Sequence, residues 1–266
     1  MLNEKKKKSV SRNAEDNKFE YNKYDGIKTG KRLGREFFAR DGITVARELL
    51  GKILVHETSV GVVRGIITET ESYMGENDKG AHTYGGRRTE RTEPMYHQGG
   101  TSYVYLIYGM YSCMNIAVMT EGIPQAVLLR RVEPADVESG RRMELLRMRG
   151  QRERELRRLK ADKSGNPAET LRTAEASQPG EALRAAAPPE SEKVPSAIRR
   201  HLADGPGKMC IAMEITRKDN DLDMVNSEAF YVTEGIRVEP GQIKAGKRIG
   251  IDYAEEAADY LWRFYL

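Results

Sequence analysis

Several features that define common protein classes are scarce in this sequence. Two cysteines among 266 residues exclude a disulfide scaffold and a four-cysteine zinc site. No run of about 18 apolar residues occurs, so we expect no membrane-spanning helix. The lysine run at residues 5–8 has no apolar stretch behind it, which is unlike a secretory signal. These absences predict a soluble protein of a reducing compartment.

An excess of charge of one sign is also lacking. Lys and Arg number 44 against 40 Asp and Glu, a formal net charge of +4. This balance permits a nucleic-acid partner without arguing for one. The charged fraction of 32% is nevertheless high beside a hydrophobic fraction of 39%. The surplus polarity is concentrated in a few segments.

Two of these segments predict chain outside the folded body. Residues 1–30 are lysine-rich and poor in aliphatic side chains, which predicts a disordered or loosely attached basic arm. Residues 161–200 are rich in Pro and Ala and lack apolar periodicity. They predict a flexible insert, whose bounds we place at about 151–196.

A basic stretch precedes the insert. Residues 141–160 contain nine basic and three acidic side chains, and four apolar residues lie near helical spacing: Met143, Leu146, Leu156 and Leu159. We expect a basic helix that projects from the body. Such a helix is either a solvated charged face or a contact for a polyanion.

The remaining residues, 31–140 and 201–266, predict a single folded domain. Thr44 is expected to cap a short helix that runs through Leu50 and is closed by Gly51. Residues 52–58 and 62–73 alternate as a hairpin, 102–107 and 112–118 as a second one, and 126–132 as another strand. Antiparallel strands with a few helices predict an α+β fold.

Tyrosine is concentrated in one part of this domain. Seven of the thirteen tyrosines lie between residues 73 and 111: Tyr73, Tyr84, Tyr96, Tyr103, Tyr105, Tyr108 and Tyr111. A buried tyrosine hydroxyl needs a hydrogen-bond partner, so a plain core would favour Phe and Leu. The cluster is typical of a surface that stacks on planar ligands such as nucleobases, and equally of a Tyr-rich sheet face.

The strand 65–73 carries a pair of carboxylates. Period-2 alternation places Glu69, Glu71 and Tyr73 on one face. The two carboxylates then lie about 7 Å apart along the strand. In a cleft, repulsion and desolvation would raise the pKa of one of them, as a hydrolase that activates water requires. An exposed edge strand protected by charge is the alternative interpretation.

Several other polar residues lie in segments where their side chains need a hydrogen-bond partner or a ligand. His82 precedes the G-G-R-R segment at 85–88, in which glycines allow close approach of a ligand and arginines can bind phosphates. A lone histidine, by contrast, is more typical of a structural role. Asn115 lies in an apolar strand, so its amide needs a backbone or ligand partner. Of Arg130 and Arg131, which end another apolar strand, one side chain must leave the core.

Taken together, these segments resemble a known family. TETESYMGENDKGAHTYGGRRTERTEPMY, followed by GTSYVYLIYGMYSCMNIAV and AVLLRRVEP, closely resembles the alkyladenine (3-methyladenine) DNA glycosylase family. RLGREFFARDGITVARELLGKILV before them, and LADGPGKMC, RIGIDYAEEA and WRFYL after them, also fit in the family's order. The resemblance covers residues 31–140 and 201–266, and the basic arm and the insert depart from it.

The resemblance implies a fold and an activity. The fold would be one mixed domain with a curved antiparallel sheet and surrounding helices. The activity would be hydrolytic removal of alkylated or deaminated purines from double-stranded DNA, without a metal or cofactor. No lysine accompanies Glu71 as a Schiff-base nucleophile, so we expect a monofunctional enzyme that leaves an abasic site. We expect a monomer without a membrane partner, in the cytoplasm of a bacterium or the nucleus of a eukaryote.

The resemblance also implies roles for particular residues. Glu71 would be the general base, and Arg130 would position its water or hold the phosphate of the flipped nucleotide. Tyr73, His82 and Tyr105 would stack on the extruded base, while Asn115 would crowd the 2-position of a normal guanine.

DNA contacts are implied elsewhere. Tyr108, at a hairpin tip, would fill the gap that the flipped base leaves in the duplex. Arg87 and Lys208 would contact backbone phosphates. Glu69 would be a supporting residue, and Cys113 and Cys210 would be small buried hydrophobes.

Two other functions fit parts of the sequence. The tyrosines and basic stretches fit a damaged-DNA-binding protein without chemistry. The Glu69/Glu71 pair fits a carbohydrate hydrolase. Base release from DNA, and the salt dependence of DNA binding, separate these hypotheses.

Overall fold

The computed structural model describes residues 21–24, 26–27, 29–107, 111–164 and 193–266. Eight strands in this part of the chain form one sheet. Their bounds are β1 (Ile53–Thr58), β2 (Gly61–Tyr73), β3 (Ser102–Ile107), β4 (Tyr111–Val118), β5 (Gln125–Pro134), β6 (Phe230–Thr233), β7 (Lys244–Gly246) and β8 (Arg263–Tyr265).

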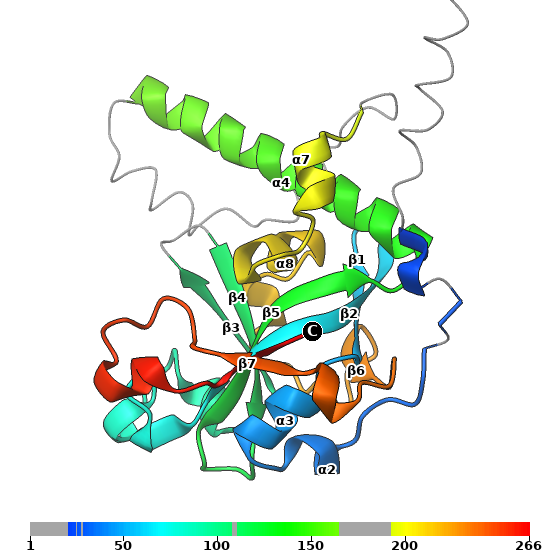
Figure 1. Cartoon of the computed structure of the whole chain (residues 1–266). Coiled ribbons are helices and arrows are strands. Elements are labelled where there is room, and N and C mark those ends of the chain that lie inside the picture. The colour runs from blue at the N-terminus through cyan, green and yellow to red at the C-terminus, as the bar shows by residue number, and fades with distance from the viewer. Residues whose placement is uncertain (1–20, 25, 28, 108–110, 165–192) are drawn as a thin grey trace, which may run out of the picture.

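The sheet is antiparallel and its long central strand is β2. The order is β3-β4-β5-β2-β1-β6, and β8 pairs with the second half of β2 and with β7. The sheet curls into a half-barrel (Figure 1). Because β2 has partners on both edges and is covered on both faces, most of its side chains are buried. The predicted α+β fold is confirmed.

Helices cover the sheet. They are α2 (Arg35–Phe38), α3 (Gly42–Glu48), α4 (Val137–Ser164), α7 (Ser196–Arg200) and α8 (Pro206–Ala212). Single 3-10 turns are η1 (Tyr21–Tyr24), η2 (Gly75–Asn77), η3 (Tyr84–Gly86), η4 (Glu93–Tyr96), η5 (Arg217–Asp219), η6 (Pro240–Gln242) and η7 (Glu255–Asp259). Helix α8 lies between the sheet and the long helix α4, while α2 and α3 lie at the opposite end (Figure 1).

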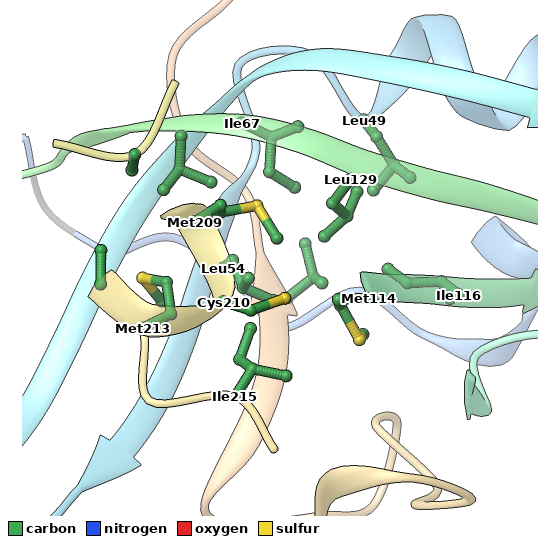
Figure 2. Packing of buried hydrophobic residues seen from close by; sticks show 14 of the residues in the cluster. Leu49, Leu54, Ile67, Met114, Ile116, Leu129, Met209, Cys210, Met213 and Ile215 are labelled. Carbon is green, nitrogen blue, oxygen red and sulfur yellow. The ribbon is translucent and has the colours of Figure 1, made fainter. Parts of the chain in front are cut away.

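The main core lies between α8, α3 and the sheet. Figure 2 shows Met209 and Cys210 of α8 pointing toward Leu54, Ile67 and Leu129 of three strands. All five side chains are at most 1% exposed. Cys113 is buried as well, and both cysteines are free, as expected for small hydrophobes. Among the described residues, no helix is long and apolar enough to cross a membrane.

Most of the predicted elements form, with one capping error. Both hairpins and the strand at 126–132 are present, and the helix at 44–50 is α3. Its N-cap is Asp41, whose carboxylate accepts from the Thr44 backbone N–H at 3.0 Å. Thr44 as the cap was therefore wrong: an Asp three residues earlier meets a free N–H of the first turn. Gly51 has a φ of +85° beyond the helix end, a conformation that favours glycine.

The segments predicted outside the body have mixed outcomes. Residues 141–160 lie in α4, so the predicted basic helix is confirmed; its Met143 is buried, whereas Leu156 and Leu159 are exposed. The predicted insert at 151–196 begins within α4, and residues 165–192 lie outside the described residues. So do residues 1–20 of the predicted arm, but η1 packs on α4, where the Tyr21 hydroxyl donates to Glu144 Oε1 at 2.7 Å.

Candidate active site

The E-T-E-x-Y segment lies in the second half of β2, in the middle of the sheet. Glu71 and Thr70 are both fully buried, and they point to opposite faces. Thr70 donates to the Ala46 carbonyl of α3, whereas Glu71 and Glu69 share contacts with Arg130. The predicted common face of the two glutamates is therefore confirmed, and the edge-strand interpretation is wrong because β5 and β8 flank this part of β2.

The buried Glu71 carboxylate has two hydrogen-bond donors and one ion-pair partner. Oε1 accepts from the Ile249 backbone N–H at 2.8 Å and lies 3.1 Å from Arg130 Nη1. Oε2 accepts from the Tyr73 hydroxyl at 2.9 Å. Burial raises the pKa of Glu71, and Arg130, Ile249 and Tyr73 oppose that rise only in part. The site thus holds a carboxylate whose proton affinity is above its ordinary value.

Arg130 links the two glutamates. Its Nε donates to Glu69 Oε1 at 3.0 Å, and Arg263 Nη1 binds the same oxygen at 3.2 Å. The ladder between β2 and β5 pairs Glu69 with Arg131 and Thr70 with Leu129, so Arg130 falls in an irregularity. Such bulges re-aim side chains. Arg130 turns to the carboxylates, and Arg131 is the one that leaves the core.

A second buried ion pair supports this face, and sequence reasoning missed it. Arg248 binds Asp78 through both Nη atoms, at 2.5 and 2.7 Å, with both side chains fully buried. The Arg248 guanidinium also lies 4.8 Å from the Tyr73 ring centroid and 5.0 Å from that of Trp262. It therefore supports Tyr73 directly and Glu71 through Ile249, the next residue. The signal in the sequence that could have indicated this ion pair is the arginine of the R-I-G-I-D-Y block.

An aromatic cluster lies on the same sheet face. The strand registers align Tyr103, Asn115 and Leu128 with Glu71 in one row across β3, β4, β5 and β2. Side chains in such a row share a face. Tyr105 stands two residues beyond Tyr103, and its electrostatic coupling to Glu71 is consistent with this placement. The sheet thus brings the tyrosines and the carboxylates together.

His82 completes the cluster from outside the sheet. Its Nδ1 lies 2.9 Å from the Tyr103 hydroxyl, and its ring meets that of Tyr105 edge-on at 4.7 Å. Burial, with the nearby charges of Arg91 and Arg87, lowers the pKa of His82 to about 4. His82 is therefore neutral at physiological pH. Arg91, which the sequence did not single out for this place, lies 4.9 Å from the Tyr105 ring centroid.

The other candidate residues have separate positions. The Asn115 amide donates to the Tyr103 carbonyl at 3.1 Å, which supplies the backbone partner that its burial requires. Arg87 is exposed next to the His82 cluster. Lys208 lies in the first turn of α8 and pairs with Asp204 at 3.0 Å. Tyr108 lies outside the described residues.

This chain is similar to known proteins over most of its length. Residues 36–266 match the methylpurine-DNA glycosylase (MPG) family. A protein of Clostridium acetobutylicum named "Putative 3-methyladenine DNA glycosylase" is 43% identical over 235 residues, 88% of this chain and 94% of the relative. Proteins of the same name from Desulfitobacterium hafniense and Clostridium novyi are 41% and 40% identical over 236 residues, 89% of this chain and 95% of each relative.

Proposed function

This chain belongs to the methylpurine-DNA glycosylase family of N-glycosylases, which act in base excision repair of alkylated purines, and on that premise we propose a mechanism and a substrate range for it. It hydrolyses the N-glycosidic bond of alkylated or deaminated purines flipped out of duplex DNA, with Glu71 as the general base. The observation that carries this proposal is a fully buried Glu71, held by two hydrogen bonds and an ion pair with Arg130, on the sheet face that also presents Tyr105.

The donors around Glu71 define where water would bind. A carboxylate has about four acceptor sites. Among the described residues, Oε1 has one hydrogen-bond donor and the ion pair with Arg130, whereas Oε2 has one hydrogen-bond donor. Oε2 can therefore accept a hydrogen bond from a water molecule. That water attacks C1′, its proton passes to Glu71, and the purine leaves with the bonding electrons, which yields a free base and an abasic site.

The aromatic cluster suits an extruded purine. A base alkylated at N3 or N7 carries positive charge, which attracts the electron-rich faces of Tyr73 and Tyr105. His82 is neutral, so it stacks on the base or hydrogen-bonds to it without adding like charge. We propose that Asn115 crowds the 2-position of guanine. Because a cationic purine is already a good leaving group, one carboxylate suffices for the chemistry.

Base release tests the role of Glu71. We expect wild-type protein to release alkylpurines from duplex DNA and Glu71→Gln to be slower by about 10²–10⁴-fold, the usual contribution of a general base. Glu69→Gln is the matched control: its carboxylate is held by Arg130 and Arg263, so the loss should be much smaller. Equal release by wild type and Glu71→Gln would overturn the assignment. Tight binding to damaged DNA without release would favour a binding protein.

Tyr108 is proposed as the wedge that replaces the flipped base in the stack. Flipping costs a few kcal/mol in a duplex and little in a single strand. Tyr108→Ser should therefore slow release from duplex DNA while release from single-stranded DNA stays near wild type. Equal losses on both substrates would contradict a wedge. A panel of N3-methyladenine, hypoxanthine and ethenoadenine would define the lesion range.

DNA contacts and oligomeric state complete the proposal. Arg87, beside the His82 cluster, and Lys208, at the start of α8, are proposed backbone-phosphate contacts. The protein is proposed to act as a monomer on double-stranded DNA without a cofactor. Light scattering of the protein alone and bound to one duplex tests the stoichiometry.

A further inference from the structure

Arg147, in the middle of α4, is a buried cation that forms no ion pair with a carboxylate among the described residues. It is 9% exposed, and its Nε has no hydrogen-bond partner within the described part of the chain. Burial lowers its pKa, the charge of Arg154 lowers it further, and Asp204 opposes both. An unpaired buried charge is unfavourable unless a partner compensates it. The residue is therefore a candidate for a site that binds an anion.

Arg147 is the buried end of a cationic stripe. Arg154 and Arg158 follow it at i+7 and i+11, and at about 100° per residue these three side chains point within about 40° of one another. Exposure increases along the stripe, from buried Arg147 through half-buried Arg154 to exposed Arg158. The stripe thus leads from the protein interior to solvent along one face of α4.

The nearby carboxylates are engaged by other cations. Asp204 accepts from Lys208 at 3.0 Å and lies 2.6 Å from His201 Nδ1. Glu153 binds Arg157 at 2.5 Å on another face of α4. Within the described part of the chain, these two carboxylates form no ion pair with Arg147, Arg154 or Arg158, and Asp204 offsets the charge of Arg147 only from a distance.

The stripe lies next to the turn end of the β3–β4 hairpin, where β4 begins. The Arg154 guanidinium is 5.8 Å from the ring centroid of Tyr111, the first residue of β4. Gly207 of α8 packs so closely on the same ring that a Cβ there would lie 3.1 Å from it. Gly150 permits a still closer approach of α4 to α8, because a Cβ there would lie 2.7 Å from the Ile211 side chain. Helices α4 and α8 thus pack closely beside this end of the hairpin, and α4 extends past it (Figure 1).

We propose that Arg147 and Arg154 of α4, with Tyr111 of the hairpin beside them, form a binding site for a backbone phosphate of double-stranded DNA. This inference rests on the proposed function, because the duplex engaged by the hairpin is the anion that reaches the site. Arg147 supplies a desolvated guanidinium and Arg154 a second one, so the phosphate is held from the α4 side of the hairpin. Arg158 extends the contact toward the next phosphates.

Salt-dependent binding to a lesion-free duplex tests this site without any chemistry. Fluorescence anisotropy would give log K against log salt for wild type, Arg147→Met, Arg154→Met and the double variant of the full chain. Each phosphate contact contributes about 0.9 to the slope. We expect the slope to decrease by about 1 in each single variant and about 2 in the double variant. Arg152→Met is the matched control, because Arg152 points about 140° away from Arg147, and its slope should stay near wild type.

Thermal unfolding without DNA separates a binding role from a structural one. Arg147→Met removes an unpaired buried charge, so its melting temperature should equal or exceed that of wild type. A lower melting temperature, or unchanged salt slopes in all variants, would overturn the site. Stabilisation of wild type by inorganic phosphate with unchanged DNA slopes would equally overturn it, in favour of a free-anion site. Absence of salt-dependent DNA binding by wild type would instead overturn the proposed function itself.

Discussion

Arg130 and Arg147 are both 9% exposed, yet their surroundings differ. Arg130 bridges Glu69 and Glu71 in the centre of the sheet, where its charge is compensated by both carboxylates. Arg147, on α4 near the turn end of the β3–β4 hairpin, lies close to another arginine, and its Nε donates no hydrogen bond to any described residue. The first environment is complete within the protein, and the second needs an anion from outside. The proposed catalytic site thus contains its own counter-ions, whereas the proposed phosphate-binding site does not.

Removing Arg130 should give the largest effect on stability. Arg130→Met would leave Glu71 buried without its counter-ion, and breaking a buried pair in this way costs about 3–5 kcal/mol. Denaturant unfolding should show that loss, whereas Arg147→Met should show none or a gain. Arg263→Met is the matched control at the rim of the same cluster, since Arg130 would still neutralise Glu69. Similar losses of unfolding free energy in Arg130→Met and Arg147→Met would contradict the difference between the two arginines.

A substitution at Arg248 tests whether the surroundings of Glu71 depend on hydrogen-bond geometry as well as on charge. Arg248→Lys keeps the positive charge but cannot reproduce the paired bonds to Asp78. Loss of one such charged hydrogen bond should lower the free energy of unfolding by about 1.5–3 kcal/mol. Because Ile249 follows directly and donates to Glu71, kcat should fall more than KM rises. A fall in the free energy of unfolding with unchanged kcat would show that the role of Arg248 is structural.

His82 can be compared with Arg147, because it also lies near positive charges, those of Arg91 and Arg87. Its pKa is lowered from 6.5 to about 4 by burial and then by Arg91 and Arg87. The unfolded chain therefore binds more protons than the folded one between about pH 4 and pH 6.5. This contribution to stability is complete above pH 6.5 and is lost as the pH falls toward 4. Unfolding of His82→Phe should lack that part of the pH dependence; an unchanged profile would contradict the assignment.

The smallest expected effect concerns Arg91 alone. Arg91→Gln removes a positive charge next to His82, so the pKa of His82 should rise above about 4 but stay below 6.5 because burial remains. NMR titration of the imidazole measures this directly. Arg88→Gln is a suitable control, since Arg88 is engaged by Glu93 and does not contribute to the shift of His82. A lower pKa in Arg91→Gln would show that Arg91 acts on His82 in some other way.

The local sequence determined much of the fold and part of the site. Alternation along 62–73 placed Glu69, Glu71 and Tyr73 on one face, because successive side chains of a strand point to opposite sides. Both hairpins were predicted from the same periodicity, and the basic helix from apolar spacing. Thr44 was misplaced as a cap, since Asp41 offers the same type of bond one turn earlier.

Tertiary structure alone decided which charges meet. Arg248 reaches Asp78 across 170 residues, and the ladder irregularity sends Arg130 rather than Arg131 to the glutamates. In the sequence Arg147 is one of nine basic residues in a helix expected to be exposed, but the tertiary structure buries it. The physical reason is that periodicity fixes the direction of a side chain within its own element. Its partner, its burial and therefore its pKa depend on which distant element packs against it.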